Sequence, residues 1–333
     1  MEPSRLKVII VTEGGKIGGL GHIQRCLAIS QAFEEKRIKS TFIVNGDTSI
    51  KRALKGKNYQ IYNWLKRKKV FFELVKKFDI AIIDSYLGDI NFYQKLSELV
   101  KVPVYLDDNR RLDYPRGVVV NGGIHAKNIR YPKKKNIRYL LGNRYAPLRK
   151  LFWEAGVRKI KQKIKSVMVT TGGNDPQNVM PKIAQFLKVH YPALKKNIII
   201  GNAFQNIDQI KKEVDLKTGL IYFPDAKKMK EVMVHSDIAI SSGGQTLFEL
   251  ARVGVPTIAF RQAENQKLNL ETWDKEGFIE YAGDYTHLEK KLSQSLDRLS
   301  LKKDRGKRMR AGMKLVDGQG ARRIREALLI YEN

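Results

Sequence analysis

Two successive series of short apolar segments constrain the fold of this chain more than any other feature of its sequence. The first series is LKVIIVT, KSTFIVNG, DIAIID, VPVYLDD and GVVVNG, and segments with helical spacing such as HIQRCLAISQAFEEKR and NFYQKLSELVK lie between its members. Strands that are apolar throughout are typical of parallel sheets covered on both faces. Alternation of such strands with helices predicts a doubly wound α/β domain.

The alternation breaks at YPKKKNIRYLLGNRYAPLRKLFWEAGVRKIKQKIK and then resumes with SVMVTTGG, KNIIIG, GLIYFP, DIAISSGG and VPTIAF. A chain of 333 residues is long for one core and suits two. We therefore expect an α/β protein with two Rossmann-like domains facing a cleft, an amino-terminal domain of residues 1–155 and a carboxy-terminal domain of residues 156–333. The last predicted helix, GARRIREALLIYEN, has an apolar face that must dock, and it could cross back to the first domain.

The formal net charge of +29 raises nucleic acid, acidic membrane surfaces and phosphorylated substrates as partner classes. Basic stretches occur in both halves, without the motifs of nucleic-acid readers, so we expect no specific nucleic-acid partner. Weak membrane association stays open. The single cysteine, Cys26, excludes an intrachain disulfide and a cysteine-based zinc site. We expect a cytoplasmic protein, because the start resembles no signal peptide and no apolar span is long enough for a membrane helix. We also expect it to be a monomer.

The stretch VIIVTEGGKIGGLGHIQRCLAIS has the pattern strand, glycine turn, helix. Gly19 and Gly21 allow close approach of a ligand to the helix start, where free N–H groups attract anionic oxygen. A nucleoside-triphosphate P-loop would need Lys and Ser or Thr where Gly21 and His22 stand, and a dinucleotide fingerprint with Asp47 fits only loosely. A turn without a ligand is the alternative. The helix dipole predicts a lowered pKa and a neutral imidazole for His22, which suits a general base, with His125 in reserve.

A second strand-to-helix corner lies in DIAISSGGQTLFELARVGVPTIAFRQAENQ. Its glycines and helix start predict a cradle for a diphosphate. Glu249, about one turn into the helix, is placed to reach a ribose diol, although an isolated helical glutamate is usually only solvated. The amides after the next strand could add contacts. The candidate substrate-binding residues of this stretch are Ser242, Gly243, Gly244, Gln245, Thr246, Glu249, Asn265 and Gln266.

Further candidates follow other strands. In VTTGGNDPQN, Gly172, Gly173 and Asn174 would line the cleft, and Asn178 would cap the next helix. In the first domain, polar residues follow two strands, namely Asp84, Tyr86, Asp107, Asp108 and Asn109. Asp107 and Asp108 could bind Mg²⁺, but adjacent side chains point apart and no third ligand is evident. We predict neither a metal nor a cofactor. Cys26 lies four residues after His22, and its place on an apolar helix face predicts a buried thiol instead of a nucleophile.

At this point a family resemblance is visible. GLGHIQRCLAIS resembles the G-x-G-H-x-x-R-C opening of the hydrolases of pseudaminic acid synthesis, which remove UDP from UDP-2,4-diacetamido-2,4,6-trideoxy-β-L-altropyranose. DSYLGD, YLDDNRR, YLLGNRYAPLR and TTGGNDPQN are similar to that family's segments in the same order, whereas TEGGKIGG lacks the family's Arg-x-Asp. SGGQTLFE and AENQ resemble the nucleotide site of GT-B glycosyltransferases, including the lipid II N-acetylglucosaminyltransferase. The SSGGQTLFELARVG helix start is closer to these transferases.

The resemblance implies a GT-B fold, His22 as the catalytic base, Glu249 as the ribose ligand, UDP held mainly by the second domain, and no metal. We therefore expect a hydrolase of a UDP-linked sugar in which His22 takes a proton from water, UDP leaves from the corner at Gly244, and Tyr86 and Asn109 hold the sugar or the water. The alternatives are a glycosyltransferase with an acceptor hydroxyl in place of water, and a non-enzymatic protein that binds sugar nucleotides or nucleic acid.

Overall fold

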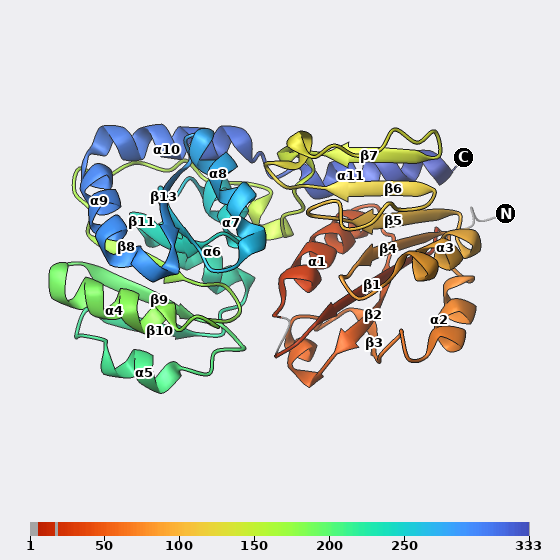
Figure 1. Cartoon of the computed structure of the whole chain (residues 1–333), viewed down its shortest axis with the longest axis horizontal. Helices are drawn as coiled ribbons and strands as arrows, with labels where there is room; N and C mark the ends of the chain where they lie inside the picture. Colours follow the sequence, from red (N-terminus) through yellow and green to blue (C-terminus); the bar gives the residue numbers. More distant parts are fainter. Residues whose placement is uncertain (1–5, 17–18, 333) are drawn as a thin grey trace. The chain divides into compact units, whose positions relative to one another are not determined.

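The computed structural model describes residues 6–16 and 19–332, which form two compact units (Figure 1). The amino-terminal unit ends at Lys150 and takes up the chain again from Gly318 onward, and the carboxy-terminal unit is Leu151–Asp317. Each unit is one parallel sheet with helices packed against it. Within the described residues, no helix is both long enough and apolar enough to cross a membrane.

The sheet of the amino-terminal unit is parallel throughout, in the strand order β3-β2-β1-β4-β5-β6-β7. Its strands are β1 (Val8–Gly14), β2 (Ser40–Gly46), β3 (Asn58–Ile61), β4 (Ile80–Asp84), β5 (Val102–Leu106), β6 (Gly117–Asn121) and β7 (Ile137–Leu141). Its helices are α1 (Gly21–Glu34), α2 (Lys68–Val75), α3 (Ile90–Leu99) and α11 (Gly320–Leu329).

Both faces of this sheet are covered. Along β1, Val8 and Ile10 face one core, which α1 and α11 complete, and Ile9 and Val11 face the other, which α2 and α3 complete. Side chains alternate between the faces of a strand, so a run that is apolar at every position supplies two cores at once. The apolar runs in the sequence therefore predicted the central strands, and the doubly wound arrangement is confirmed.

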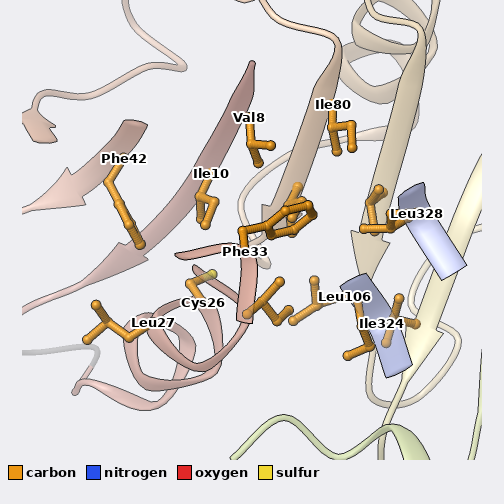
Figure 2. Close-up of a cluster of buried hydrophobic side chains, with 14 of the residues drawn as sticks. Val8, Ile10, Cys26, Leu27, Phe33, Phe42, Ile80, Leu106, Ile324 and Leu328 are labelled. Carbon is orange, nitrogen blue, oxygen red and sulfur yellow. The ribbon is translucent and has the colours of Figure 1, made fainter. Parts of the chain in front are cut away.

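Helix α11 joins the amino-terminal unit from the far end of the sequence. Ile324 and Leu328 are fully buried in the core of β1, β4 and α1 (Figure 2). The Arg325 guanidinium donates to the Ala32 carbonyl at 2.7 Å and to the Glu35 carboxylate at 3.0 Å. Hydrogen bonds from Arg322, and then from Arg325, lower the pKa of Glu35 to about 2. The helix is thus held by an apolar face and by ion pairs at its rim.

Replacing Ile324 with alanine should lower the free energy of unfolding of the amino-terminal unit by about 2–5 kcal/mol, because the deleted atoms leave a cavity beneath α11. Hydrogen–deuterium exchange of peptides from β1 and β4 measures this loss within the one unit. The control is Ile330→Ala, since Ile330 is 63% exposed and its truncation should leave the exchange rates unchanged. Equal rates in both variants would contradict the packing role of α11.

The carboxy-terminal unit repeats the plan with the strand order β10-β9-β8-β11-β12-β13, again parallel. Its strands are β8 (Ser166–Thr170), β9 (Lys195–Ile200), β10 (Thr218–Tyr222), β11 (Ile238–Ser242), β12 (Thr257–Arg261) and β13 (Ile279–Asp284). Its helices are α4 (Val179–His190), α5 (Ile207–Lys212), α6 (Ala226–His235), α7 (Thr246–Val253), α8 (Lys267–Lys275), α9 (Leu288–Ser300) and α10 (Lys302–Leu315).

Each sheet has one point at which the strand order reverses, between β1 and β4 in the amino-terminal unit and between β8 and β11 in the carboxy-terminal unit. Connections from the two strands leave in opposite directions there, and the carboxyl ends of such strands are where open parallel sheets bind ligands. The glycine corner before α1 follows β1, and the glycine corner before α7 follows β11. Both predicted sites therefore lie at reversal points.

Candidate active site

The turn between β1 and α1 is built on glycines that the backbone requires. A Cβ on Gly14 would lie 2.9 Å from the Gly19 carbonyl oxygen, and Gly19 itself has a φ of 69°, in the left-handed region. The N–H groups of Gly15 and Gly19 each donate to the other residue's carbonyl at 3.0 Å. Gly21 differs, because a Cβ there would meet no atom of residues 6–16 or 19–332 within 4 Å. Neither packing against these residues nor φ demands a glycine at Gly21.

His22 is the second residue of α1, and its ring is held by a carboxylate from a neighbouring strand. The Nδ1 atom lies 2.5 Å from Oδ1 of Asp84, the fully buried last residue of β4. Arg25, one helical turn after His22, donates from Nε at 2.9 Å and from Nη2 at 2.7 Å to the two oxygens of the same carboxylate. Arg25 also pairs with Asp108. The imidazole is thus oriented by a buried, charge-balanced network.

The pKa of His22 is raised, contrary to the prediction from the helix dipole. Burial alone would lower the pKa, but the charge of Asp84 and its hydrogen bond outweigh burial and raise it above the usual 6.5. Asp84 itself stays ionised: burial favours its neutral form, yet Arg25 and His22 lower its pKa. A bare helix start repels a proton on the ring, whereas a carboxylate 2.5 Å away attracts one.

Glu13 and Tyr86 face the other side of the imidazole. Oε1 of Glu13 lies 4.0 Å from His22 Nε2, and the same carboxylate accepts the Ser85 hydroxyl at 2.7 Å and the Tyr86 N–H at 2.9 Å. The Tyr86 ring stands edge-on to the imidazole with centroids 4.7 Å apart. Its hydroxyl donates to Asp108, and partial burial and that carboxylate raise the pKa of Tyr86, so the phenol stays protonated. Nε2 therefore faces groups that can position a water or a sugar hydroxyl.

Other predicted residues of this unit lie at the edge of the cluster or support it. Asn109 follows Asp108 and is exposed. His125 is buried, with its Nε2 3.2 Å from the Asp108 carbonyl oxygen, so it contacts the backbone of the cluster and not the His22 ring. Cys26 is fully buried, which confirms the predicted buried thiol, and burial raises the pKa of that thiol well above the usual range.

The carboxylates of Asp107 and Asp108 have separate protein partners. Asp107 accepts the Tyr131 hydroxyl at 2.5 Å and the Arg111 N–H at 3.1 Å, whereas Asp108 pairs with Arg25 and Tyr86. Among the residues that the structure covers, no group of three or more His, Cys, Asp or Glu side chains is arranged to hold a metal ion.

The second candidate site is the corner between β11 and α7. Ser242 ends the strand and its hydroxyl donates to the Thr171 carbonyl at 3.0 Å, which ties this corner to the one after β8. Gly243 is required by packing, because a Cβ would lie 2.9 Å from two atoms of Leu270. At Gly244 a Cβ would meet no atom within 4 Å among the residues that the structure describes. Gln245 precedes α7 and Thr246 begins it, as the sequence predicted.

The corner after β8 is also glycine-dependent. Gly172 has a φ of 90°, and its carbonyl oxygen and that of Gly173 would each lie 2.5 Å from a Cβ on Gly201. Asn174 accepts the N–H of Asp175 at 2.8 Å.

Capping of α4 corrects the prediction for Asn178. Asn178 does precede the helix, but its side chain makes no capping hydrogen bond. Asp175 replaces it, with its two oxygens accepting the N–H groups of Val179 at 3.0 Å and Met180 at 2.9 Å. A carboxylate at this position also balances the positive end of the helix dipole.

The remaining predicted residues of this unit lie around the same corner. Glu249 is in the first turn of α7 and is buried. Asn265 is exposed in the short 3-10 helix Glu264–Gln266 after β12, and Gln266 accepts the Gln262 N–H at 2.9 Å. Asn269 of α8 donates to the Gly243 carbonyl at 3.0 Å, which joins this segment to the glycine corner.

The carboxy-terminal half of the chain matches a known family. Residues 156–323 match the model of the glycosyltransferase family 28 C-terminal domain, which is half of the 333-residue chain. The chain belongs to this family. The matched region contains the whole β8–β13 sheet and the candidate site at Gly244.

Curated relatives extend the similarity to the amino-terminal unit. The chain is 24% identical to the spore coat polysaccharide biosynthesis protein SpsG of Bacillus subtilis, over 98% of this chain and 99% of that protein. It is also 24% identical to the pseudaminic acid cytidylyltransferase and UDP-2,4-diacetamido-2,4,6-trideoxy-β-L-altropyranose hydrolase of Helicobacter pylori, over 90% of this chain. The chain spans 52% of that relative's length, and 57% of a Methanocaldococcus jannaschii protein to which it is 24% identical over 79% of its own length.

Solved structures share the architecture of the whole chain. MurG of Acinetobacter baumannii superposes with a TM-score of 0.66 at 14% identity, covering 97% of this chain and 99% of MurG. The UDP co-structure of S. aureus MnaA gives a TM-score of 0.69 at 12% identity, covering 98% and 97%. With its two parallel-sheet units, this family member therefore has the GT-B fold.

Proposed function

We propose that the chain hydrolyses a UDP-linked sugar of the diacetamido-trideoxy hexose type, with water attacking the anomeric carbon. The observation that carries the proposal is the contact between His22 Nδ1 and Asp84, 2.5 Å long, at the carboxyl edge of the sheet. An imidazole whose Nδ1 is held by a buried carboxylate presents Nε2 as a base. Support for the substrate class comes from the Helicobacter pylori relative, whose name includes hydrolysis of such a UDP-sugar.

In the proposed step, water replaces UDP at the anomeric carbon. The water oxygen forms a bond to the anomeric carbon while His22 Nε2 takes its proton. The bond between that carbon and the diphosphate oxygen breaks, and UDP leaves with the electron pair. The Asp84 carboxylate stabilises the imidazolium that forms, and the Glu13 carboxylate, 4.0 Å from Nε2, is placed to hold the water's second hydrogen. Tyr86 and Asn109 are assigned to holding the sugar or the water.

UDP is assigned to the carboxy-terminal unit. The positive end of the α7 dipole and the backbone of the Gly244 corner would stabilise the diphosphate without a metal, and electrostatic stabilisation of a leaving group is usually the largest catalytic contribution. Glu249 is assigned to the ribose, and Asn265 and Gln266 to amide contacts. The family match supports this assignment, because it includes the whole α7 corner.

A panel of UDP-sugars incubated with the protein and no acceptor tests the proposal, with released UDP and free sugar read by mass spectrometry. Rapid release of both, in equal amounts, is expected. Tight binding of every UDP-sugar with no product, with or without an acceptor, would contradict any enzymatic function and favour a binding protein.

A glycosyltransferase is the second candidate function, favoured by the match to the glycosyltransferase family 28 C-terminal domain. In that reaction an acceptor hydroxyl replaces water at the same base. UDP release that requires an added acceptor, and a product that contains both sugar and acceptor, would identify the transferase.

The exchange Gly244→Ala should weaken UDP binding by about tenfold, or about 1.4 kcal/mol, because the methyl group would point into the space assigned to the diphosphate. Folding should be unaffected, since that Cβ meets no atom of the described residues within 4 Å. Gly156→Ala is the matched control, because a Cβ on Gly156 would also meet none of these atoms within 4 Å and this glycine lies in the same unit. Calorimetric titration with UDP measures the difference in affinity. Equal affinities of the two variants would contradict the assignment of the diphosphate to this corner.

A further inference from the structure

Three of the seven residues that line a small pocket in the amino-terminal unit are arginines. Its volume is about 380 Å³, and its walls are the segment 109–113, which follows β5, and the residues Ile129 and Arg130, which follow β6. Three of the lining residues are Arg110, Arg111 and Arg130, against one carboxylate, Asp113. The pocket therefore lies at the same carboxyl edge of the sheet as His22, and Asn109 in its wall directly follows Asp108 of the His22 cluster.

These arginines have few protein partners. The Arg130 side chain makes no hydrogen bond or ion pair with any other residue that the structure describes, and within the same residues the Arg110 guanidinium donates to the Arg130 carbonyl alone, at 2.8 Å. The Arg111 guanidinium lies over the Tyr93 ring and donates to its hydroxyl at 3.1 Å, while its buried Nε–H has no partner among the described atoms. None of the three guanidinium groups pairs with a carboxylate of the described residues. The Asp113 carboxylate pairs with Lys134 at 3.0 Å.

Asp107 holds the two loops that carry the arginines together by hydrogen bonds to both. This buried carboxylate accepts the Arg111 N–H at 3.1 Å from the first loop and the Tyr131 hydroxyl at 2.5 Å from the second. It also accepts the Tyr114 hydroxyl at 3.4 Å. One buried carboxylate therefore fixes the backbone of the first loop and the ring of Tyr131 in the second.

Like charges gathered in one pocket repel one another unless a counter-charge is bound. Guanidinium groups present a planar fork of donors that matches the oxygens of phosphate and carboxylate.

We propose that this pocket binds an oxyanion group, a phosphate or a carboxylate, beside the His22 cluster. The group is either a small free anion or an acidic substituent on the molecule that reacts at His22. The proposed hydrolysis does not require such a site, because the diphosphate of UDP is assigned to the carboxy-terminal unit and acetamido and hydroxyl groups carry no charge. The inference thus goes beyond the proposed function and stands on the arginines alone.

Isothermal titration with inorganic phosphate tests the inference on the full chain at low ionic strength, with UDP at saturation to occupy its own site. The test variant is Arg110→Gln/Arg130→Gln, which keeps Arg111 on Tyr93. The matched control is Arg52→Gln/Arg67→Gln, which removes the same charge from exposed positions of the same unit. We expect the phosphate Kd to rise at least about tenfold in the test variant and to stay within about twofold in the control.

Two further arms identify the source of the anion. Phosphate that raises the KM for the UDP-sugar competitively in the control but not in the test variant indicates an acidic substituent on the substrate, whereas phosphate binding that the test variant loses without any such competition indicates a free anion, and either supports the site. Acetate in place of phosphate reports whether a carboxylate suffices. Equal phosphate affinity in the two double variants, or no binding of either anion to the unaltered chain, would overturn the inference. Failure of the proposed function is separate, because it appears as absent UDP binding or absent turnover while phosphate binding persists.

Discussion

Replacing His22 with alanine is expected to lower the turnover number for a UDP-sugar by about 10²–10⁴-fold, the range that a general base contributes. The Asp84 carboxylate orients the imidazole through Nδ1, which leaves Nε2 as the nitrogen that takes the proton from water. UDP affinity should change by less than about threefold, because UDP is assigned to the other unit. Released UDP, measured under saturating substrate, gives the turnover number, and calorimetry gives the UDP affinity.

The matched control for this variant is His235→Ala, which removes an exposed imidazole from the end of α6. It should keep full turnover. A His22 variant that retains activity within a few-fold would contradict the assignment of the base, and a His22 variant that loses UDP affinity along with turnover would move the nucleotide to the amino-terminal unit.

The sequence was sufficient to predict the strands that lie inside the two sheets. Those strands are apolar on both faces, so a plain apolar run identifies them. Of the four edge strands, β10 was predicted from GLIYFP, whereas β3, β7 and β13 were not. In β3, Asn58 and Gln60 are exposed, and β7 lies within a stretch that the sequence assigned to the break between domains. An edge strand buries fewer side chains, so its apolar signal is weaker.

Strand β13 was missed for a different reason. Its second residue is Glu280, which is only 4% exposed. Glutamate is rarely buried, so a glutamate inside a short apolar run argues against a buried strand when the sequence is judged locally. Arg298 of α9 pairs with it at 2.8 Å, and Arg308 of α10 pairs with its other oxygen. These partners come from helices that follow in the chain, so the local pattern contains no sign of them.

The glycine turn and the histidine of the candidate site were predicted from the sequence, but the direction of the His22 pKa shift was not. The glycine turn and the histidine are adjacent in sequence, and their place at the start of α1 is confirmed. The sign of the pKa shift was wrong, because Asp84 lies 62 positions further along the chain and reaches His22 only through the pairing of β1 with β4. Glu13 was overlooked, although it ends the apolar run of β1 directly before the glycines. Arg25, one turn after His22, was also overlooked, and its spacing was the available signal.

The exchange Asp84→Asn is expected to lower kcat by about 10²–10⁴-fold, because the amide keeps the shape of the carboxylate but carries no charge to stabilise the imidazolium. It should also move the pH profile. Proton abstraction needs neutral His22, so kcat/KM rises with pH through the His22 pKa, which Asp84 raises above 6.5. Without that charge the pKa falls, and the acidic limb of the profile should shift to lower pH while its plateau drops.

The control for this exchange is Asp108→Asn, which also takes a carboxylate partner from Arg25 but leaves the contact between His22 and Asp84 in place. Each variant leaves the Arg25 guanidinium with one carboxylate partner fewer, so both should lower the stability of the fold. Thermal unfolding of both variants measures this shared loss. A structural role alone would give the two variants similar losses of activity and an unmoved acidic limb. Asp108 also raises the His22 pKa, but less than Asp84 does, so an acidic limb that moves further in the Asp84 variant than in the Asp108 variant assigns the larger part of the raised pKa, and with it the orientation of the base, to Asp84.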